Sequence, residues 1–215
     1  MNRNYYFALL FAVAMVCLTG CNQTENGNTA DNPDASNAPK VKVETSMGDF
    51  VITLQPDKAP QTVAQFLENV NNGVYDNSIV QEVRMDFMAL FGCINLTTED
   101  PESADGSAAD DAVKRIPNEA ASGNSNKKWT VAMLRAPDEI ESDSVQFFIN
   151  MNDNSGLDAK QDGENSPETC GYCVFGVVTD GFNVLEAINQ TPTTEKEEFE
   201  YAPEQDIVIT KMSVL

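Results

Sequence analysis

The chain has 215 residues, of which 41% are hydrophobic and 22% are charged, a composition that suits one globular domain with a sizeable buried core. Thirteen Lys and Arg stand against 34 Asp and Glu, and the resulting formal charge of −21 repels phosphate backbones and argues against nucleic-acid binding. Histidine is absent, which excludes Ser-His-Asp and Cys-His catalytic systems and metals held by imidazole.

The first 20 residues have the order of segments typical of an export signal: a basic head, an apolar run over residues 7–16 and a small-residue end. The apolar run is too short to span a bilayer as a permanent helix. The Leu-Thr-Gly-Cys sequence that ends at Cys21 resembles the lipobox of bacterial lipoproteins, in which the cysteine is lipidated and becomes the mature N-terminus. We therefore predict a lipoprotein signal peptide at residues 1–20 and a lipid anchor on Cys21, with a buried first helix as the alternative.

The residues after Cys21 bear on location and on domain boundaries. Asn22 is not the aspartate that signals retention in the inner membrane, so we expect an exported lipoprotein anchored in the outer membrane and facing the periplasm. Residues 21–39 have almost no apolar content, and such a segment gains too little from burial to become ordered. We predict a flexible polar linker at 21–39 and a folded domain at 40–215.

The folded domain has the patterns of short strands and two helices. Alternation around a Ser-Met-Gly-Asp turn predicts a β-hairpin over residues 41–54, and Pro60 followed by an apolar stripe predicts a helix that Gly73 closes. Further strands are expected at 79–83, 87–92, 130–134, 146–149 and 174–178, then a helix at 182–189 and a strand at 206–214. Seven or eight short strands with two helices favour a mainly β fold, an antiparallel barrel whose ends the helices cover.

Three cysteines belong to the folded domain: Cys93, Cys170 and Cys173. The last two have the C-x-x-C spacing of redox and zinc sites. Because the chain has no second such pair and no histidine, the favoured interpretation is small buried cysteines in or beside a strand. We expect no metal and no cofactor, and the pairing of the three cysteines stays open.

Five ordered blocks of the domain resemble the bacterial cyclophilins. The blocks are residues 43–52 (VxxSMGDFVI), 59–66 (APxTVxxF), 118–120 (NEA), 146–150 (QFFIN) and 171–176 (GYCVFG). The resemblance extends from about residue 41 to residue 215. It implies a closed eight-stranded antiparallel barrel capped by two helices, and it implies peptidyl-prolyl cis-trans isomerase (rotamase) activity.

The resemblance places Glu82 where cyclophilins have their catalytic arginine. The X–Pro amide resists rotation because its nitrogen shares a lone pair with the carbonyl. In cyclophilins an arginine in a Phe-His-Arg-Val motif donates a hydrogen bond towards that nitrogen, and this chain has Val-Gln-Glu-Val at residues 80–83 instead. A carboxylate only accepts hydrogen bonds. Period-two alternation puts Arg84 on the same face, where it either pairs with Glu82, the favoured interpretation, or supplies a substitute donor.

The resemblance also implies a set of residues that bind substrate around a proline slot. They are Phe87, Met88, Leu134, Arg135, Gln146, Phe148, Leu157 and Tyr172. Other positions depart from the family, because Leu134 and Phe91 are larger than the usual alanine and glycine, and Gly156 replaces an aromatic residue. We expect Gln146 to meet peptide backbone, since a polar group in an apolar strand needs a partner.

Three functions remain open at this stage. The first is an envelope-tethered peptidyl-prolyl isomerase that assists protein folding, with weak activity because of Glu82. The second is a non-catalytic chaperone or scaffold lipoprotein that binds proline-containing segments of unfolded envelope proteins. The third is a structural lipoprotein whose slot is filled by Leu134 and Phe91. None of them involves nucleic acid, and each is attached to a membrane by its N-terminal lipid.

Overall fold

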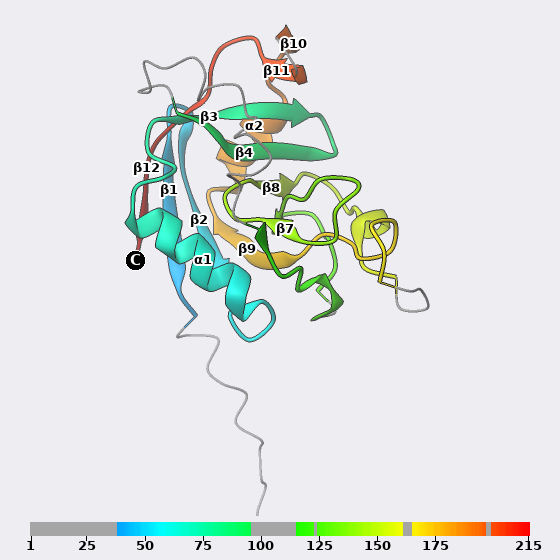
Figure 1. Cartoon of the computed structure of the whole chain (residues 1–215). Helices are drawn as coiled ribbons and strands as arrows, with labels where there is room; N and C mark the ends of the chain where they lie inside the picture. The colour runs from blue at the N-terminus through cyan, green and yellow to red at the C-terminus, as the bar shows by residue number, and fades with distance from the viewer. Residues whose placement is uncertain (1–37, 96–114, 123, 161–164, 197–198) are drawn as a thin grey trace, which may run out of the picture. The chain divides into compact units, whose positions relative to one another are not determined.

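The computed structural model describes residues 38–95, 115–122, 124–160, 165–196 and 199–215 (Figure 1). The predicted signal peptide, the predicted lipidation site Cys21 and nearly all of the predicted linker lie outside these residues. The first strand begins at Lys40. Within the described ranges, no helix is both long enough and apolar enough to cross a membrane.

Eight strands form one closed barrel (Figure 1). Their bounds are β1 Lys40–Thr45, β2 Gly48–Leu54, β3 Ser78–Arg84, β4 Met88–Asn95, β6 Thr130–Met133, β8 Phe147–Asn150, β9 Val174–Asp180 and β12 Val208–Val214. Their order around the barrel is β1-β12-β3-β4-β8-β6-β9-β2, and antiparallel pairing of β2 with β1 closes it. The predicted mainly β fold, an eight-stranded antiparallel barrel with two helices, is confirmed.

The two helices, α1 Pro60–Asn71 and α2 Phe182–Asn189, pack their apolar faces on the barrel core. The residue before α1 provides no side-chain cap. Glu119, distant in sequence, takes that role: its carboxylate accepts hydrogen bonds from the backbone N–H groups of Gln61 (3.2 Å) and Thr62 (2.9 Å) and from the Thr62 hydroxyl (2.8 Å). A negative charge at this end of a helix also interacts favourably with the helix dipole.

Small elements lie in the connections between barrel strands. They are a sheet of β5 Arg115–Ile116 with β7 Ser142–Asp143, a hairpin of β10 Thr193–Lys196 with β11 Phe199–Pro203, and the 3-10 helices η2 Ala120–Ser122 and η3 Ser155–Leu157. The β10–β11 hairpin was not predicted, because its first strand is polar and none of its residues is buried. β11 lies against β3, and this places the hairpin on the outside of the barrel.

The barrel interior is filled largely by aromatic rings. Phe147 of β8 stacks on Phe91 of β4, with ring centroids 5.2 Å apart and planes within 4°. Phe66 of α1 and Tyr75 meet the same Phe147 ring edge-to-face, at 5.3 and 5.5 Å. Phe91 and Phe147 point inward because every second residue of a strand does so, and Phe66 belongs to the apolar face of α1.

Candidate functional site

Alternate residues of the same strands face outward and form a second apolar cluster. Leu90 of β4 is in register with Phe148 of β8, and Phe148 is in register with Ala132 of β6, which faces Val174 of β9. These four buried side chains form one row across the outside of the barrel. We call the row, together with its partly buried apolar neighbours, the outer cluster; the neighbours are Met88, Leu134, Leu157, Tyr172 and Phe199.

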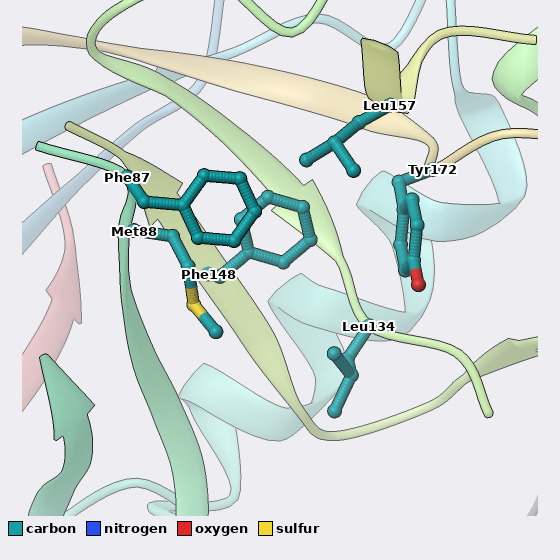
Figure 2. Close-up of a pocket in the computed structure, with 6 residues that line it drawn as sticks. All are labelled: Phe87, Met88, Leu134, Phe148, Leu157 and Tyr172. Atoms are coloured by element: carbon teal, nitrogen blue, oxygen red, sulfur yellow. The ribbon is translucent and has the colours of Figure 1, made fainter. Parts of the chain in front are cut away.

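A pocket opens within the outer cluster (Figure 2). It is lined by Phe87, Met88, Leu134, Phe148, Leu157 and Tyr172, and its volume is about 290 Å³ including its mouth. Figure 2 shows Phe87 and Met88 on one side, with Leu157 and Tyr172 on the other. The Tyr172 hydroxyl is the one oxygen among these six side chains, so the pocket suits a small apolar ring.

The open pocket bears on the hypothesis that Leu134 and Phe91 fill the slot. Leu134 lines the pocket at one edge and leaves it open (Figure 2). Phe91 points into the barrel, where it is fully buried, because it follows Leu90 and successive strand residues face opposite sides. The hypothesis of a filled slot is therefore wrong, and the space is available to a ligand.

Glu82 lies on the outer face of β3, beside the outer cluster. The register between β3 and β4 shifts between Val80 and Glu82, and this bulge places Glu82 opposite Leu90. Since Leu90 is in turn opposite Phe148, Glu82 stands two strand spacings, about 10 Å, from the floor of the pocket. The residue is only 6% exposed. A carboxylate buried to this degree needs a partner.

Arg84 is that partner, as the alternation predicts. Its Nη2 donates a hydrogen bond to Glu82 Oε1 at 3.0 Å, and its Cζ lies 5.1 Å from the centroid of the Tyr201 ring. In the register of β3 with β4, Arg84 is opposite Met88, one of the residues lining the pocket. Its Nε is buried and has no hydrogen-bond partner among the described residues. The guanidinium therefore lies between a carboxylate and a ring, and its buried Nε–H makes no hydrogen bond to a described residue.

Arg135, a predicted substrate-binding residue, packs against the Tyr172 ring, which lines the pocket. It is buried, and its Cζ lies 4.6 Å from the centroid of the Tyr172 ring. Its Nε donates to the backbone oxygen of Gly171 at 2.9 Å, and its two terminal nitrogens donate to the carbonyls of residues 136, 137, 139 and 167. The guanidinium thus donates its hydrogen bonds to backbone carbonyls, and Arg135 is not among the six residues that line the pocket.

Gln146 is also not among those six residues. It stands just before β8, and its backbone carbonyl accepts a hydrogen bond from the Leu134 N–H at 2.9 Å. Its own N–H donates to Asp143 Oδ1 at 3.1 Å. Of the eight predicted substrate-binding residues, the structure brings six together around the pocket and places Arg135 and Gln146 beside them.

Comparison with known proteins shows which family the chain belongs to. A family model described as cyclophilin type peptidyl-prolyl cis-trans isomerase matches residues 40–214. The chain is 37% identical over 175 residues to the peptidyl-prolyl cis-trans isomerase cyp18 of Streptomyces antibioticus, and 35% identical over 176 residues to peptidyl-prolyl cis-trans isomerase B of Escherichia coli strain K12. Each alignment covers 81% of this chain and 98% of the relative. The chain belongs to the cyclophilin-type peptidyl-prolyl cis-trans isomerase family.

Solved structures of other cyclophilins share the fold. A cyclophilin-type peptidyl-prolyl cis-trans isomerase of Cryptosporidium parvum, crystallised in the presence of the dipeptide Ala-Pro, superposes with a TM-score of 0.63. The match covers 82% of this chain and 98% of that one, at 19% sequence identity. At this identity the likeness concerns the barrel alone.

The C-x-x-C cysteines of this cyclophilin lie in packed surroundings. Cys170 and Cys173 are both buried and are not disulfide-bonded. Burial raises the pKa of the Cys173 thiol to about 11, and the Thr62 hydroxyl lies 3.6 Å from its sulfur. The thiol is therefore protonated at neutral pH, which is the state of a structural cysteine. In the part of the chain that the structure describes, no group of three His, Cys, Asp or Glu could hold a metal ion.

Two residues near the site escaped the sequence analysis: Phe199, which packs on the outer cluster, and Tyr201, which lies under the Arg84 guanidinium. Both belong to β11, a strand that was not predicted. The Phe-Glu-Tyr sequence does have aromatic residues at period-two spacing, which is typical of a strand that covers an apolar surface. That spacing was the available signal.

Proposed function

We propose that this cyclophilin is a proline-directed isomerase of low turnover, which binds X–Pro segments well and accelerates their rotation weakly. One arrangement supports the proposal: an open apolar pocket shares the outer face of the barrel with the Glu82–Arg84 ion pair. The pocket supports binding, and the ion pair supports weak turnover.

Binding follows from the chemistry of the lining. The side chains around the pocket are apolar apart from one hydroxyl, so a proline ring entering it leaves water for an apolar surface. Burying an apolar side chain in this way is favourable by about 1.5–3 kcal/mol. Phe148 and Tyr172 form a rigid corner, since their rings meet edge-to-face at 5.6 Å and Arg135 backs the second ring.

Weak turnover follows from the charged groups beside the pocket, Glu82 and Arg84. A donor aimed at the transition state contributes about 2.7–4 kcal/mol in other enzymes. The Glu82 carboxylate only accepts hydrogen bonds, and it engages Nη2 of Arg84, the nearest cation on that face. The Arg84 side chain is 41% exposed and one of its five N–H donors is engaged by Glu82, so the residual activity in this proposal depends on the rest of this guanidinium.

A protease-coupled assay on a short Ala-Pro-Phe peptide tests the proposal, because the protease cleaves only the trans isomer. We expect a kcat/KM at least about a hundredfold below that of an arginine-bearing relative assayed in parallel. An Arg84→Ala variant should lower the remaining activity further while leaving the Kd for the peptide within about twofold. Binding with no measurable turnover in the wild type would instead establish a non-catalytic proline-binding chaperone or scaffold. Turnover equal to the relative's would overturn the proposal.

We extend the proposal to location: the enzyme acts on proline-containing segments of unfolded envelope proteins while tethered by lipid on Cys21. The apolar run, the lipobox-like sequence and the polar residues 21–39 support this proposal, because together they form a signal, an anchor and a spacer. Cells expressing the full chain with a radiolabelled fatty acid should yield a labelled protein in the outer-membrane fraction. A Cys21→Ser variant that remains labelled would contradict lipidation at this cysteine.

A further inference from the structure

Four of the six residues that line the pocket lie outside the barrel strands, and one of them, Leu134, directly follows β6. Phe87 lies in the turn between β3 and β4, Leu157 ends η3, and Tyr172 lies in the segment before β9. Connecting segments are ordinarily the most mobile parts of a fold. A pocket with three such walls keeps its shape only if something fixes the walls to one another and to the barrel.

A network of three asparagine side chains connects these walls. Asn154 Nδ2 donates hydrogen bonds to the backbone oxygen of Phe87 and to Asn150 Oδ1, both at 2.8 Å. The Asn154 carbonyl accepts the Leu157 N–H at 2.9 Å. Asn150, at the end of β8, therefore ties the Phe87 wall and the Leu157 wall to a barrel strand.

The third asparagine, Asn126, extends the network to the opposite wall. Its Nδ2 donates to the backbone oxygen of Tyr172 at 3.3 Å and to Asp158 Oδ1 at 3.0 Å, and its Oδ1 accepts from Asn150 Nδ2 at 3.2 Å. The Tyr172 N–H donates to the Leu157 carbonyl at 2.9 Å. The walls at Phe87, Leu157 and Tyr172 are thus joined through a continuous chain of hydrogen bonds.

The chemistry of the network requires amides. Asn126 and Asn150 are fully buried, and the Nδ2 of each of the three asparagines donates to two different acceptors. An NH₂ group has two hydrogens, so no donor is spare and each amide has one fixed orientation. An aspartate has the same shape but no such donors, and it would face the Phe87 or Tyr172 carbonyl with a negative charge.

We infer that Asn126, Asn150 and Asn154 are positioning residues for the proline pocket, acting through the backbones of Phe87 and Tyr172 and not by contact with the peptide. The inference rests on the proposed function, since it assigns these residues to the same pocket. It predicts that loss of the network loosens the pocket walls and weakens peptide binding beyond any general loss of stability.

Asn69 provides a matched control. It is also buried, and its Nδ2 donates to the Ser144 carbonyl at 2.6 Å and to the Tyr75 hydroxyl at 3.2 Å, which do not line the pocket. Removing either kind of asparagine breaks buried hydrogen bonds and lowers stability. Only the network residues should change the pocket.

The experiment compares Asn154→Ala, Asn154→Asp, Asn126→Ala and Asn69→Ala in the full chain, at a temperature well below the Tm of every variant. NMR titration with an Ala-Pro-Phe peptide gives each Kd, and ring and methyl signals of Phe87, Leu157 and Tyr172 report the free pocket. We expect the three network variants to raise the Kd at least tenfold and to broaden or shift those signals. Asn69→Ala should keep the Kd within twofold and leave the signals in place.

Two outcomes separate this inference from the proposed function. Wild-type affinity in Asn154→Asp and Asn126→Ala, with unchanged Phe87 and Tyr172 signals, would overturn the positioning role while the pocket still binds proline. If the wild type binds no peptide, the proposed function is wrong, and the free-state signals then decide the inference: walls that move in the network variants and not in Asn69→Ala support it, and walls that stay in place overturn it.

Discussion

The two apolar clusters of this cyclophilin are built from alternate residues of the same strands, yet they have different roles. In β4, Ala89 and Phe91 point inward and are fully buried, while Leu90 between them points outward. The inner cluster is closed by rings that touch one another, whereas the outer cluster leaves a pocket. In β4, β6, β8 and β9 the inward residues fill the barrel core and stabilise the fold, and the outward residues form the outer cluster around the pocket.

The largest expected effect is on the inner cluster. Phe147 touches the rings of Phe66, Tyr75, Phe91 and Phe175 and is fully buried. Phe147→Ala leaves a cavity that its neighbours cannot close, so we expect a loss of about 3–5 kcal/mol in the free energy of unfolding. Urea denaturation followed by circular dichroism measures it. A loss below 1 kcal/mol would show that the aromatic core is not what holds the barrel together.

The next largest effect concerns the outer cluster, where we expect a small loss of stability and a large loss of peptide affinity. Leu157 is half-buried at the pocket wall, so Leu157→Ala should cost only about 1 kcal/mol of stability. The same variant should raise the Kd for an Ala-Pro-Phe peptide about tenfold, because one wall of the slot is missing. Isothermal calorimetry beside a urea melt separates the two quantities. Unchanged affinity would contradict the assignment of peptide binding to the outer cluster.

The smallest effect concerns the loss of folding stability at low pH. Burial alone would raise the pKa of Asp158, but hydrogen bonds from the Asn126 N–H groups and the Ser125 hydroxyl outweigh it and lower that pKa. A lowered folded-state pKa gives stability that is present above the unfolded value, about 3.9, and is lost as pH falls through the folded value. Asp158→Asn should therefore lower the urea midpoint at pH 7 and change it less at pH 3. Equal losses at both values would contradict a role for the ionised carboxylate.

Most of the fold was predictable, because its signals are local. Period-two alternation marks the strands of the barrel, and Pro60 marks the start of α1. The β10–β11 hairpin was not predictable from its first strand, Thr193–Lys196, which is polar and lies outside the barrel. The capping of α1 by Glu119 was equally hidden, since it joins residues nearly sixty positions apart.

The site was predictable as far as family motifs reach. They place six of the eight predicted binding residues around the pocket, and alternation pairs Glu82 with Arg84. They do not show that Arg135 gives its guanidinium to backbone carbonyls. Nor do they show that three asparagines join the pocket walls. Each of these depends on which groups meet in space, which sequence spacing alone does not fix.

The proposed function requires that the pocket is intact and that Glu82, an acceptor, occupies the position where the resemblance to cyclophilins places a donor. The most direct test is the kcat/KM of Glu82→Arg against the wild type on an Ala-Pro-Phe peptide, with Glu82→Gln as a control that removes the charge without supplying a guanidinium. We predict a rise of at least about tenfold for Glu82→Arg, a much smaller change for Glu82→Gln, and peptide Kd values within a factor of two of the wild type. Unchanged turnover in Glu82→Arg at wild-type affinity would contradict the claim that the missing donor limits this enzyme.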